Sequence, residues 1–383
     1  MPVEPTQGGE LRQYVLLNPG PGNTTESVRR ALLTPDLCHR EAEFFEAMRE
    51  VRHGLLEVAG VSEDTHAAVL LTASGTAAVE AAVCSAVPPG RALLVLVNGT
   101  YGDRIRQMAV AHGIPHAALT WGWTEPADPG AVARALDGDP GLSHVALIHH
   151  ETTTGLLNPL HEIGEVVRRA GRALIVDAMS SFGGEAIDVE RDHIDLLAAS
   201  ANKCLQGMPG ISFVIGRRAA FEALRGHPAR SVYLEHGRQY AYQERDDTPF
   251  TPAIQVLFAL RQAIREALEE TVAGRIRRYR EAAEALRAGM EALGLRILVP
   301  PGRRSGSVTT FALPDGVDYT TLHDAMKRRG YVIYAGHGDL SKQAFRVANI
   351  GTLTAEDMRR AVAAFADVLA GLGVRTGPAA PTR

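Results

Sequence analysis

The chain of 383 residues contains little cysteine, no block of basic residues and no long apolar run. Its three cysteines, Cys38, Cys84 and Cys204, share no CxxC spacing, which argues against a disulfide framework or a cysteine-rich zinc site. With 40 Lys+Arg against 44 Asp+Glu the formal net charge is −4, which argues against a nucleic-acid binder that neutralises phosphates. The longest apolar stretches, such as residues 92–97, have the length of a strand, whereas a membrane helix needs about 20 residues.

What remains is the composition of an ordinary globular protein, with 45% hydrophobic and 22% charged residues. The N-terminal residues show no basic segment followed by an apolar one, so we expect a cytoplasmic protein. At about 150 residues per domain, the length predicts two or three domains. We expect neither a membrane nor a nucleic acid as a binding partner.

Short, continuously apolar runs alternate with helical patterns over the first two-thirds of the chain, as in a sheet covered on both faces. The predicted strands are residues 67–72, 91–97, 116–119, 145–149, 173–177, 196–200 and 211–216. The predicted helices between them are residues 76–87, 101–112, 129–136 and 159–170. This alternation predicts an α/β fold with a mostly parallel, doubly wound sheet, in which ligands bind at the carboxyl ends of strands.

The pattern changes after about residue 250. A long helical segment over residues 253–293 contains Gly274, which predicts a broken or bent connector. After it we predict strands over residues 307–312, 331–334 and 344–347, and helices over residues 319–329 and 355–372. The predicted division is a large domain with an N-terminal arm, residues 1–255, and a smaller C-terminal α/β domain, residues 256–383.

Two charged residues follow predicted strands. Asp177 ends the strand in ALIVDAMSSFGG, and Lys203 follows the strand in AASANKCLQGMPG. Alone, the aspartate could cap a helix or a turn, and the lysine could be a solvated loop residue. Together they suit pyridoxal 5′-phosphate, because a lysine forms its Schiff base and an aspartate pairs with its protonated ring nitrogen.

A possible phosphate site lies between the strand over residues 67–72 and the next helix. Ser74, Gly75 and Thr76 are small, so backbone N–H groups can approach an anion at the N-terminus of the helix. An ordinary cap and turn would also explain these residues. Their position between a strand and a helix favours the phosphate site.

Motifs spread along nearly the whole chain make it resemble the class V (fold-type I) pyridoxal-phosphate aminotransferases, and among them the 2-aminoethylphosphonate–pyruvate transaminase branch. They are LLNPGPGNTT (16–25), ASGTAAVEA (73–81), VNGTYGDRI (97–105), HHETTTGLLNP (149–159), VDAMSSFGG (176–184), SANKCLQG (200–207), TPFTPAIQVLFALR (248–261) and FRVANIG (345–351). The resemblance implies a fold-type I transferase whose large domain binds the cofactor. A cysteine desulfurase is set aside, because it needs a cysteine well beyond the lysine and the last one here is Cys204.

The resemblance implies a role for each matching residue. Lys203 would form the Schiff base and move the proton between substrate and cofactor, Asp177 would hold the ring nitrogen, and the phosphate would lie on Ser74, Gly75 and Thr76. The remaining roles fall to Tyr101 (stacking on the ring), Thr152 or Thr153 (the ring hydroxyl), Thr251 (a phosphate in the partner subunit of a homodimer), Arg346 (a carboxylate or phosphonate) and Arg40 (near the substrate).

Each of these residues also has an ordinary interpretation. Tyr101 could pack the start of a helix, the threonines could stabilise a turn, and Arg40 could be a solvated residue at a helix start. Arg346 lies in an apolar segment, where a structural salt bridge is the alternative. The neighbouring His149 and His150 lack the spacing of metal ligands, so we predict loop structure or pocket lining and no metal site.

One loop departs from the pattern of the branch. Its members tend to read IYPGK-like before the arginine motif, whereas residues 333–338 here are Ile-Tyr-Ala-Gly-His-Gly. The proline is missing and His337 stands near the expected lysine. If this loop selects the substrate, the amino donor differs from 2-aminoethylphosphonate, for example a hydroxylated phosphonate or another small ω-amino acid.

The predicted function is therefore transamination from 2-aminoethylphosphonate, or a close aminophosphonate, to pyruvate, which gives phosphonoacetaldehyde and L-alanine. Two alternatives stay open: an ammonia-lyase acting on a hydroxylated aminophosphonate, and an alanine–glyoxylate-type aminotransferase. A non-enzymatic cofactor-binding regulator would be expected to lose Lys203 or Asp177, and both are present. The sequence leaves open the exact donor and acceptor, the pathway's direction and any assembly beyond a dimer.

Overall fold

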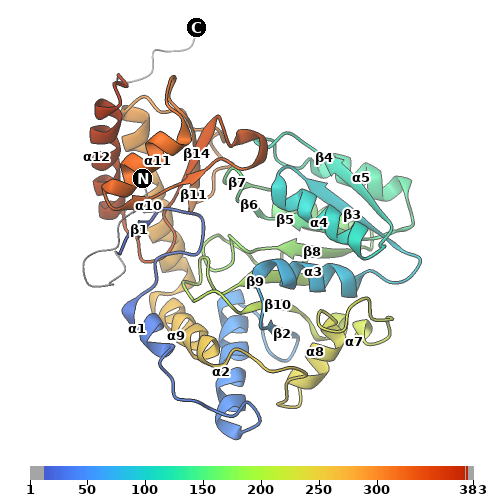
Figure 1. Ribbon diagram of the computed structural model, residues 1–383. Helices are drawn as coiled ribbons and strands as arrows, with labels where there is room; N and C mark the ends of the chain where they lie inside the picture. Colours follow the sequence, from blue (N-terminus) through green and yellow to red (C-terminus); the bar gives the residue numbers. More distant parts are fainter. Residues whose placement is uncertain (1–12, 376, 378–383) are drawn as a thin grey trace.

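A seven-stranded sheet forms the centre of the larger part of the molecule in the computed structural model, which describes residues 13–375 and Gly377 (Figure 1). Its strands lie in the order β2-β10-β9-β8-β5-β3-β4. They are β2 (His66–Leu71), β3 (Ala92–Val97), β4 (His116–Thr120), β5 (Leu142–Ile148), β8 (Ala173–Asp177), β9 (Leu196–Ser200) and β10 (Ser212–Arg217). Within this sheet β10 runs antiparallel to both of its neighbours and the other pairs are parallel, so the predicted mostly parallel sheet is confirmed.

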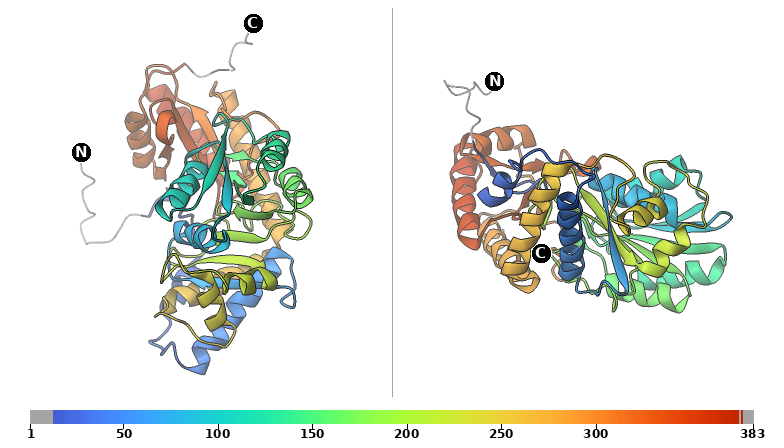
Figure 2. Two further views of the ribbon diagram at one scale, coloured as in Figure 1. Left: turned by 90° about the vertical axis from the view of Figure 1, so that its right-hand side faces the viewer. Right: turned by 90° about the horizontal axis from the view of Figure 1, so that it is seen from below.

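Helices cover both faces of this sheet, as Figure 2 shows in the view from below. One face carries α3 (Gly75–Ala86), α4 (Thr100–Ala111), α7 (Arg218–Leu224) and α8 (His236–Gln243). The other carries α2 (Ala42–Ala59), α5 (Pro129–Gly138), α6 (Leu160–Arg169) and α9 (Ile254–Glu270). Successive residues of β5 enter opposite cores, Val145 and Leu147 on one side and Ala146 and Ile148 on the other, because strand side chains alternate.

The predicted connector over residues 253–293 is broken, as expected, but at a different residue. The structure has α9 and then α10 (Val272–Ala292), with the break at Thr271, whose φ is 64°. Gly274 lies inside α10, and its N–H donates to the Thr271 hydroxyl at 3.0 Å. The helix therefore restarts on the Thr271 side-chain cap rather than bending at the glycine.

The C-terminal part has its own sheet and its own core. Its antiparallel sheet has the order β11 (Val308–Ala312), β14 (Ala344–Ala348), β13 (Tyr334–Ala335), and it packs with α10, α11 (Tyr319–Arg328) and α12 (Ala355–Gly371). The ring of Phe345 stacks on Phe311, with 5.5 Å between ring centroids, and also packs on Phe365. This core is separate from the two that cover the large sheet.

The first described residues join the C-terminal part rather than the large sheet. Strand β1 (Val15–Leu16) pairs in parallel with β12 (Tyr331–Val332), and Leu17 is buried in the C-terminal core. Helix α1 (Glu26–Ala31) then packs on α9, whose Leu257 and Leu260 belong to the core under α2. The division at residues 255 and 256 stays a prediction. Among the described residues, no helix combines the length and apolarity needed to cross a membrane.

A short hairpin ties the two parts together next to the strand ends of the large sheet. It consists of β6 (His150–Glu151) and β7 (Leu156–Leu157), directly after β5. The N–H of Ser305 donates to the carbonyl of Gly155 at 2.9 Å. Gly155 has a φ of +83°, and a Cβ there would lie 2.5 Å from the carbonyl oxygen of Val308. The junction therefore requires glycine for its conformation and for its space.

We expect Gly155→Ala to lower the melting temperature by several degrees more than the matched variant Gly302→Ala. Gly302 has the same φ of +83° but nothing within 4 Å of the added methyl group. Both variants therefore carry the left-handed backbone strain, about 1–2 kcal/mol, and Gly155→Ala adds an overpacking cost of about 1–3 kcal/mol. Thermal unfolding followed by circular dichroism checks this, and equal melting temperatures would contradict the junction.

Candidate active site

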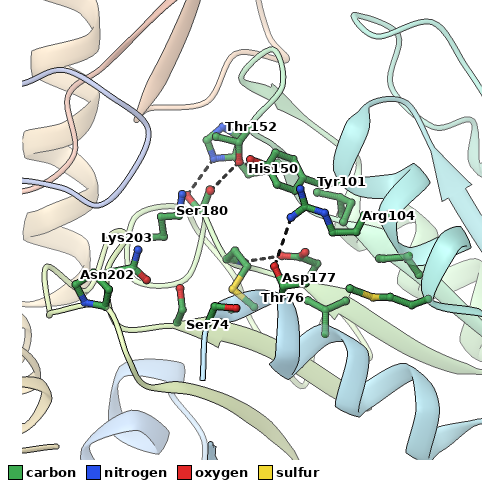
Figure 3. Close-up of a pocket in the computed structure, with 18 of the residues that line it drawn as sticks. Ser74, Thr76, Tyr101, Arg104, His150, Thr152, Asp177, Ser180, Asn202 and Lys203 are labelled. Carbon is green, nitrogen blue, oxygen red and sulfur yellow. Dashed lines mark hydrogen bonds between the residues drawn. The ribbon is translucent and has the colours of Figure 1, made fainter. Parts of the chain in front are cut away.

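A pocket of about 430 Å³ opens where the parallel strands of the large sheet end, a volume within the usual range of small-molecule sites (Figure 3). Asp177 ends β8, and Lys203 follows β9. Its lining brings together most of the predicted site residues: Ser74, Gly75, Thr76, Tyr101, Thr152, Asp177 and Lys203. They come from segments far apart in the chain because the carboxyl ends of parallel strands meet at one edge.

Lys203 is partly buried, and Pro19 and Gly20 of the N-terminal arm lie against it. Its Nζ donates to the carbonyl of Pro19 at 2.6 Å. Gly20 has a φ of +128°, and a Cβ there would lie 2.5 Å from Nζ, so the arm approaches the lysine closely through its backbone. Burial lowers the pKa of Lys203 to about 8, and the charge of Arg346 acts in the same direction. Near neutral pH, a much larger fraction of this amine is therefore uncharged than in an ordinary lysine.

Asp177 is a buried carboxyl without a cationic partner. Its Oδ1 accepts a hydrogen bond from the N–H of Met179 at 2.9 Å, and no Lys, Arg or His of the described chain lies within ion-pair distance. Burial raises the pKa of Asp177 to about 7, and the nearby carboxylate of Glu151 adds to the shift. Such a group favours a ligand that brings a positively charged N–H donor to it.

The start of α3 faces the pocket and has no side-chain cap. Ser74 is the N-cap residue, but its side chain makes no capping hydrogen bond. Ser74, Gly75 and Thr76 all line the pocket. Uncapped N–H groups and the helix dipole both favour an anion, which agrees with the predicted phosphate site.

A buried carboxylate fixes Tyr101 at the start of α4. Glu151 accepts the N–H of Gly102 at 3.2 Å on one oxygen and the hydroxyl of Thr153 on the other. The Thr153 hydroxyl oxygen in turn accepts the N–H of Thr100 at 3.1 Å. Burial raises the pKa of Glu151, and these hydrogen bonds act in the opposite direction by lowering it. Thr153 is therefore part of the support of α4.

Thr152, the alternative to Thr153, faces the pocket. Its Oγ1 lies 2.7 Å from the hydroxyl of Ser180, which lines the same pocket (Figure 3). The structure therefore favours Thr152 as the residue that meets a ligand, and its contact with the cofactor stays a prediction.

His150 lines the pocket, which is one of the two interpretations predicted for the neighbouring His149 and His150. Its Nδ1 donates to the carbonyl of Ser180 at 3.0 Å, and burial lowers the pKa of His150 to about 4, so the ring is neutral. Within the residues that the structure describes, no group of three His, Cys, Asp or Glu side chains could hold a metal ion.

Arg346 reaches the edge of the site from β14 of the C-terminal part. Its Nε donates to the carbonyl of Ala335 at 2.9 Å, and its Nη1 donates to the carbonyl of Thr152 at 3.0 Å. Burial lowers the pKa of Arg346, although arginine remains charged. In the described chain no carboxylate pairs with it, so the structural salt bridge considered as the alternative is not seen and the guanidinium can bind an external anion.

The loop over residues 333–338 of the C-terminal part lies against α4, beside Arg346. The Nδ1 of His337 lies 3.0 Å from the Thr100 hydroxyl, and its ring centroid lies 6.1 Å from that of Tyr101. At Gly338 a Cβ would lie 2.5 Å from the ring of Trp123. Burial lowers the pKa of His337, and the charge of Arg346 adds to the shift, which favours the uncharged ring.

Thr251 and Arg40 do not reach this pocket. Thr251 is exposed and borders a small cavity together with Phe44 and Tyr233. Arg40 is half-exposed and forms an ion pair with Asp247. The role predicted for Thr251 concerns a partner subunit, and both roles stay predictions.

Polar residues outside the sequence-based prediction also line the pocket, among them Arg104, Ser180 and Asn202. Arg104 lies three residues after Tyr101 on α4, and residues three apart share a face of a helix. That spacing within VNGTYGDRI is a signal that could have identified it.

Comparisons with known proteins agree with this geometry. The sequence profile of the family described as Aminotransferase class-V matches residues 28–353. A 2-aminoethylphosphonate–pyruvate transaminase of Syntrophobacter fumaroxidans is 40% identical over 361 residues, which cover 93% of this chain and 96% of that one. The structure of a ureidoglycine–glyoxylate aminotransferase from Bacillus subtilis has a TM-score of 0.90 at 26% identity, covering 96% of this chain and 95% of that one. An alanine–glyoxylate aminotransferase from a Nostoc species has a TM-score of 0.89 at 29% identity, covering 96% and 98%.

We expect the amine of Lys203 to titrate near pH 8 in protein freed of bound small molecules. The chain has three lysines, Lys203, Lys327 and Lys342, so protein labelled with [15Nζ]lysine gives three side-chain signals in a nuclear magnetic resonance spectrum. Because burial favours the uncharged form, the Lys203 signal should change between about pH 7 and pH 9. Lys203→Met identifies the signal by removing it. A midpoint above pH 10 would contradict the buried, desolvated amine.

Proposed function

The chain belongs to the class V aminotransferases, and we propose that it transfers the amino group of 2-aminoethylphosphonate to pyruvate, giving phosphonoacetaldehyde and L-alanine. The predicted resemblance to this family and the predicted fold-type I architecture are confirmed. The observation that carries the proposal is that one pocket is lined both by Lys203, whose pKa is lowered, and by the carboxyl of Asp177, which has no ion-pair partner in the described chain.

Class V aminotransferases use pyridoxal phosphate, and the pocket fits this cofactor. A buried carboxyl without a cation suits its ring nitrogen, a reactive amine suits its aldehyde carbon, and an uncapped helix N-terminus suits its phosphate. The residues that would hold it are Lys203 (aldehyde carbon), Asp177 (ring nitrogen), Ser74, Gly75 and Thr76 (phosphate), Tyr101 (ring face) and Thr152 (ring hydroxyl).

Asp177 would keep the ring nitrogen protonated. A carboxylate beside a positively charged N–H is stabilised by it, so the pKa of Asp177 falls from its raised value once the pair forms. When bound, the cofactor supplies an electron sink for the carbon that carries the amino group. The acid strength of that carbon therefore depends on Asp177.

Lys203 would move the proton. With the cofactor and donor bound, the Nζ of Lys203 would act as the base that removes the proton from the amine-bearing carbon and, as the conjugate acid, would donate that proton again. Its lowered pKa keeps a useful fraction of neutral amine near pH 7. The backbone of Pro19 and Gly20 lies against Nζ and would limit the access of water to this transfer.

Arg346 would bind the anionic group of both substrates. The donor carries a phosphonate and the acceptor a carboxylate, and a planar guanidinium can form paired hydrogen bonds with either. Its two bonds to the carbonyls of Ala335 and Thr152 fix its plane at the pocket edge before a substrate arrives. One residue therefore serves both halves of the reaction.

We further propose a homodimer with the sites at the subunit interface. The exposed position of Thr251, outside the pocket of its own chain, supports its predicted role in the partner's site. Arg40 would likewise need another copy of the chain to approach a substrate. A cytoplasmic location stays a prediction from the N-terminal sequence.

One observation favours a second candidate function, ammonia release from a hydroxylated aminophosphonate. The resemblance to the branch implies a lysine near this position, where His337 stands with a pKa lowered by burial. A donor with a hydroxyl next to its phosphonate would lose water and, after hydrolysis, yield phosphonoacetaldehyde and ammonia. Lys203 and Asp177 would serve this reaction equally well, so the donor decides between the two.

The decisive assay supplies each donor with and without pyruvate and measures alanine and ammonia separately. We expect 2-aminoethylphosphonate and pyruvate to give alanine and phosphonoacetaldehyde in equal amounts. Lys203→Ala should lower the rate by roughly 100- to 10,000-fold or more, because proton transfer is lost. Lys342→Ala, an exposed lysine, is the matched control and should leave the rate unchanged. Ammonia formed without any acceptor would overturn the proposal in favour of the lyase.

We expect Arg346→Gln to lower kcat/KM for both donor and acceptor by roughly 30- to 700-fold, through KM in particular, because a charged hydrogen-bond partner of an anion is worth about 2–4 kcal/mol. Arg296→Gln, an exposed arginine of the C-terminal part, is the control. The visible absorbance of the bound cofactor should stay unchanged in both variants. An effect on one substrate alone would contradict the shared anion site.

A further inference from the structure

Arg104 is a pocket arginine that none of the roles above uses. Its guanidinium lies 4.8 Å from the centre of the Tyr101 ring, and its Nη1 donates to the Thr76 hydroxyl at 3.4 Å, a long and weak hydrogen bond (Figure 3). In the described part of the chain no carboxylate lies within ion-pair distance of Arg104. The cation therefore points at the helix N-terminus without a strong partner.

This lack of a partner is not a general property of α4. Arg106, two residues further on, forms an ion pair with Asp103 at 2.7 Å and does not line the pocket. Arg104 instead rests on the Tyr101 ring, which holds the plane of the guanidinium by a cation–π contact. Its orientation toward Thr76 is therefore set by the residue that would cover the cofactor ring.

The charge balance of the pocket shows what Arg104 can bind. A phosphate ester carries close to two negative charges at pH 7, whereas a helix N-terminus offers about half a positive charge. Of the other cations near the site, Lys203 would be committed to the aldehyde carbon, and Arg346 lies outside the pocket lining, held by the carbonyls of Ala335 and Thr152. Arg104 is thus the cation that remains next to Thr76.

Resting on the proposed pyridoxal-phosphate site, we propose that Arg104 is a phosphate-binding residue of the cofactor. Its Nη1 exchanges the weak bond to the Thr76 hydroxyl for a charge-assisted bond to a phosphate oxygen. Because Arg104 and Tyr101 lie on one turn of α4, that helix holds the cofactor's ring and its phosphate together. The donor's phosphonate is chemically similar, so the test must separate the two anions.

The test compares pyridoxal phosphate with pyridoxal, which has the same aldehyde and ring but no phosphate. Cofactor-free protein is titrated with each, and the Kd is measured from the visible absorbance of the bound cofactor. We expect Arg104→Gln to raise the Kd of pyridoxal phosphate at least 30-fold and that of pyridoxal less than threefold. Arg104→Lys should recover part of the affinity, and Arg106→Gln should match the unaltered protein.

A second measurement separates charge from packing. The phosphorus-31 resonance of the bound cofactor reports the protonation of its phosphate, and Arg104→Gln should raise the pH at which it titrates, since a lost cation favours the protonated form. Equal loss of affinity for both compounds would overturn the proposal, as would an unchanged Kd with a raised KM for the phosphonate donor. Failure of the unaltered protein to bind pyridoxal phosphate would instead overturn the proposed function.

Discussion

The unpaired burial of Asp177 is the constraint on which the rest of the site depends. A carboxyl at the end of a central strand, enclosed by protein on both faces of the sheet, loses its hydration and gains no cation from the described chain. The cost appears as the raised pKa of Asp177, while the same enclosure lowers the pKa of Lys203. With Arg104 and Arg346 also lacking carboxylate partners, the pocket holds several groups whose charges a single ligand can balance: a cationic ring nitrogen for the acid, and anions for the arginines.

The architecture divides the chemistry between two parts of the fold. The large sheet fixes Asp177 and Lys203, because Asp177 ends β8, Lys203 follows β9, and these two strands are hydrogen-bonded to each other. The C-terminal part supplies Arg346, and through the pairing of β1 with β12 it also carries the arm that covers Lys203. A displacement of the C-terminal part relative to the sheet would therefore move Arg346 and the cover of Lys203 together. Under the proposed roles, anion binding by Arg346 and the covering of Lys203 would thereby be coupled through the backbone.

Local pattern was sufficient for some features and insufficient for others. Continuous apolar runs predicted the strands of the large sheet, and the polar residues at their ends predicted Asp177 and Lys203, because parallel strands bring their carboxyl ends together. Thr152 and Thr153 could not be separated, since a buried hydrogen bond to Glu151 distinguishes them. The break at Thr271 could not be predicted, because a positive φ at a threonine leaves no local pattern in the sequence. The pairing of β1 with β12 could not be predicted either, because strands of two residues are too short to show a pattern and depend on tertiary contacts.

His337 shows why Lys203 and Asp177, in their proposed roles, do not by themselves determine the reaction. A lysine in the mouth of the pocket would add a full positive charge for a dianionic phosphonate, whereas a neutral imidazole held by the Thr100 hydroxyl adds none. In its proposed role Arg346 would then bind the anion with less electrostatic help, and a donor with an extra hydroxyl could recover some of the loss by a hydrogen bond to the imidazole ring of His337. Such a hydroxyl is also the leaving group that elimination requires. Under the proposed roles, the loop over residues 333–338, rather than Lys203 or Asp177, would decide between transfer and release of the amino group.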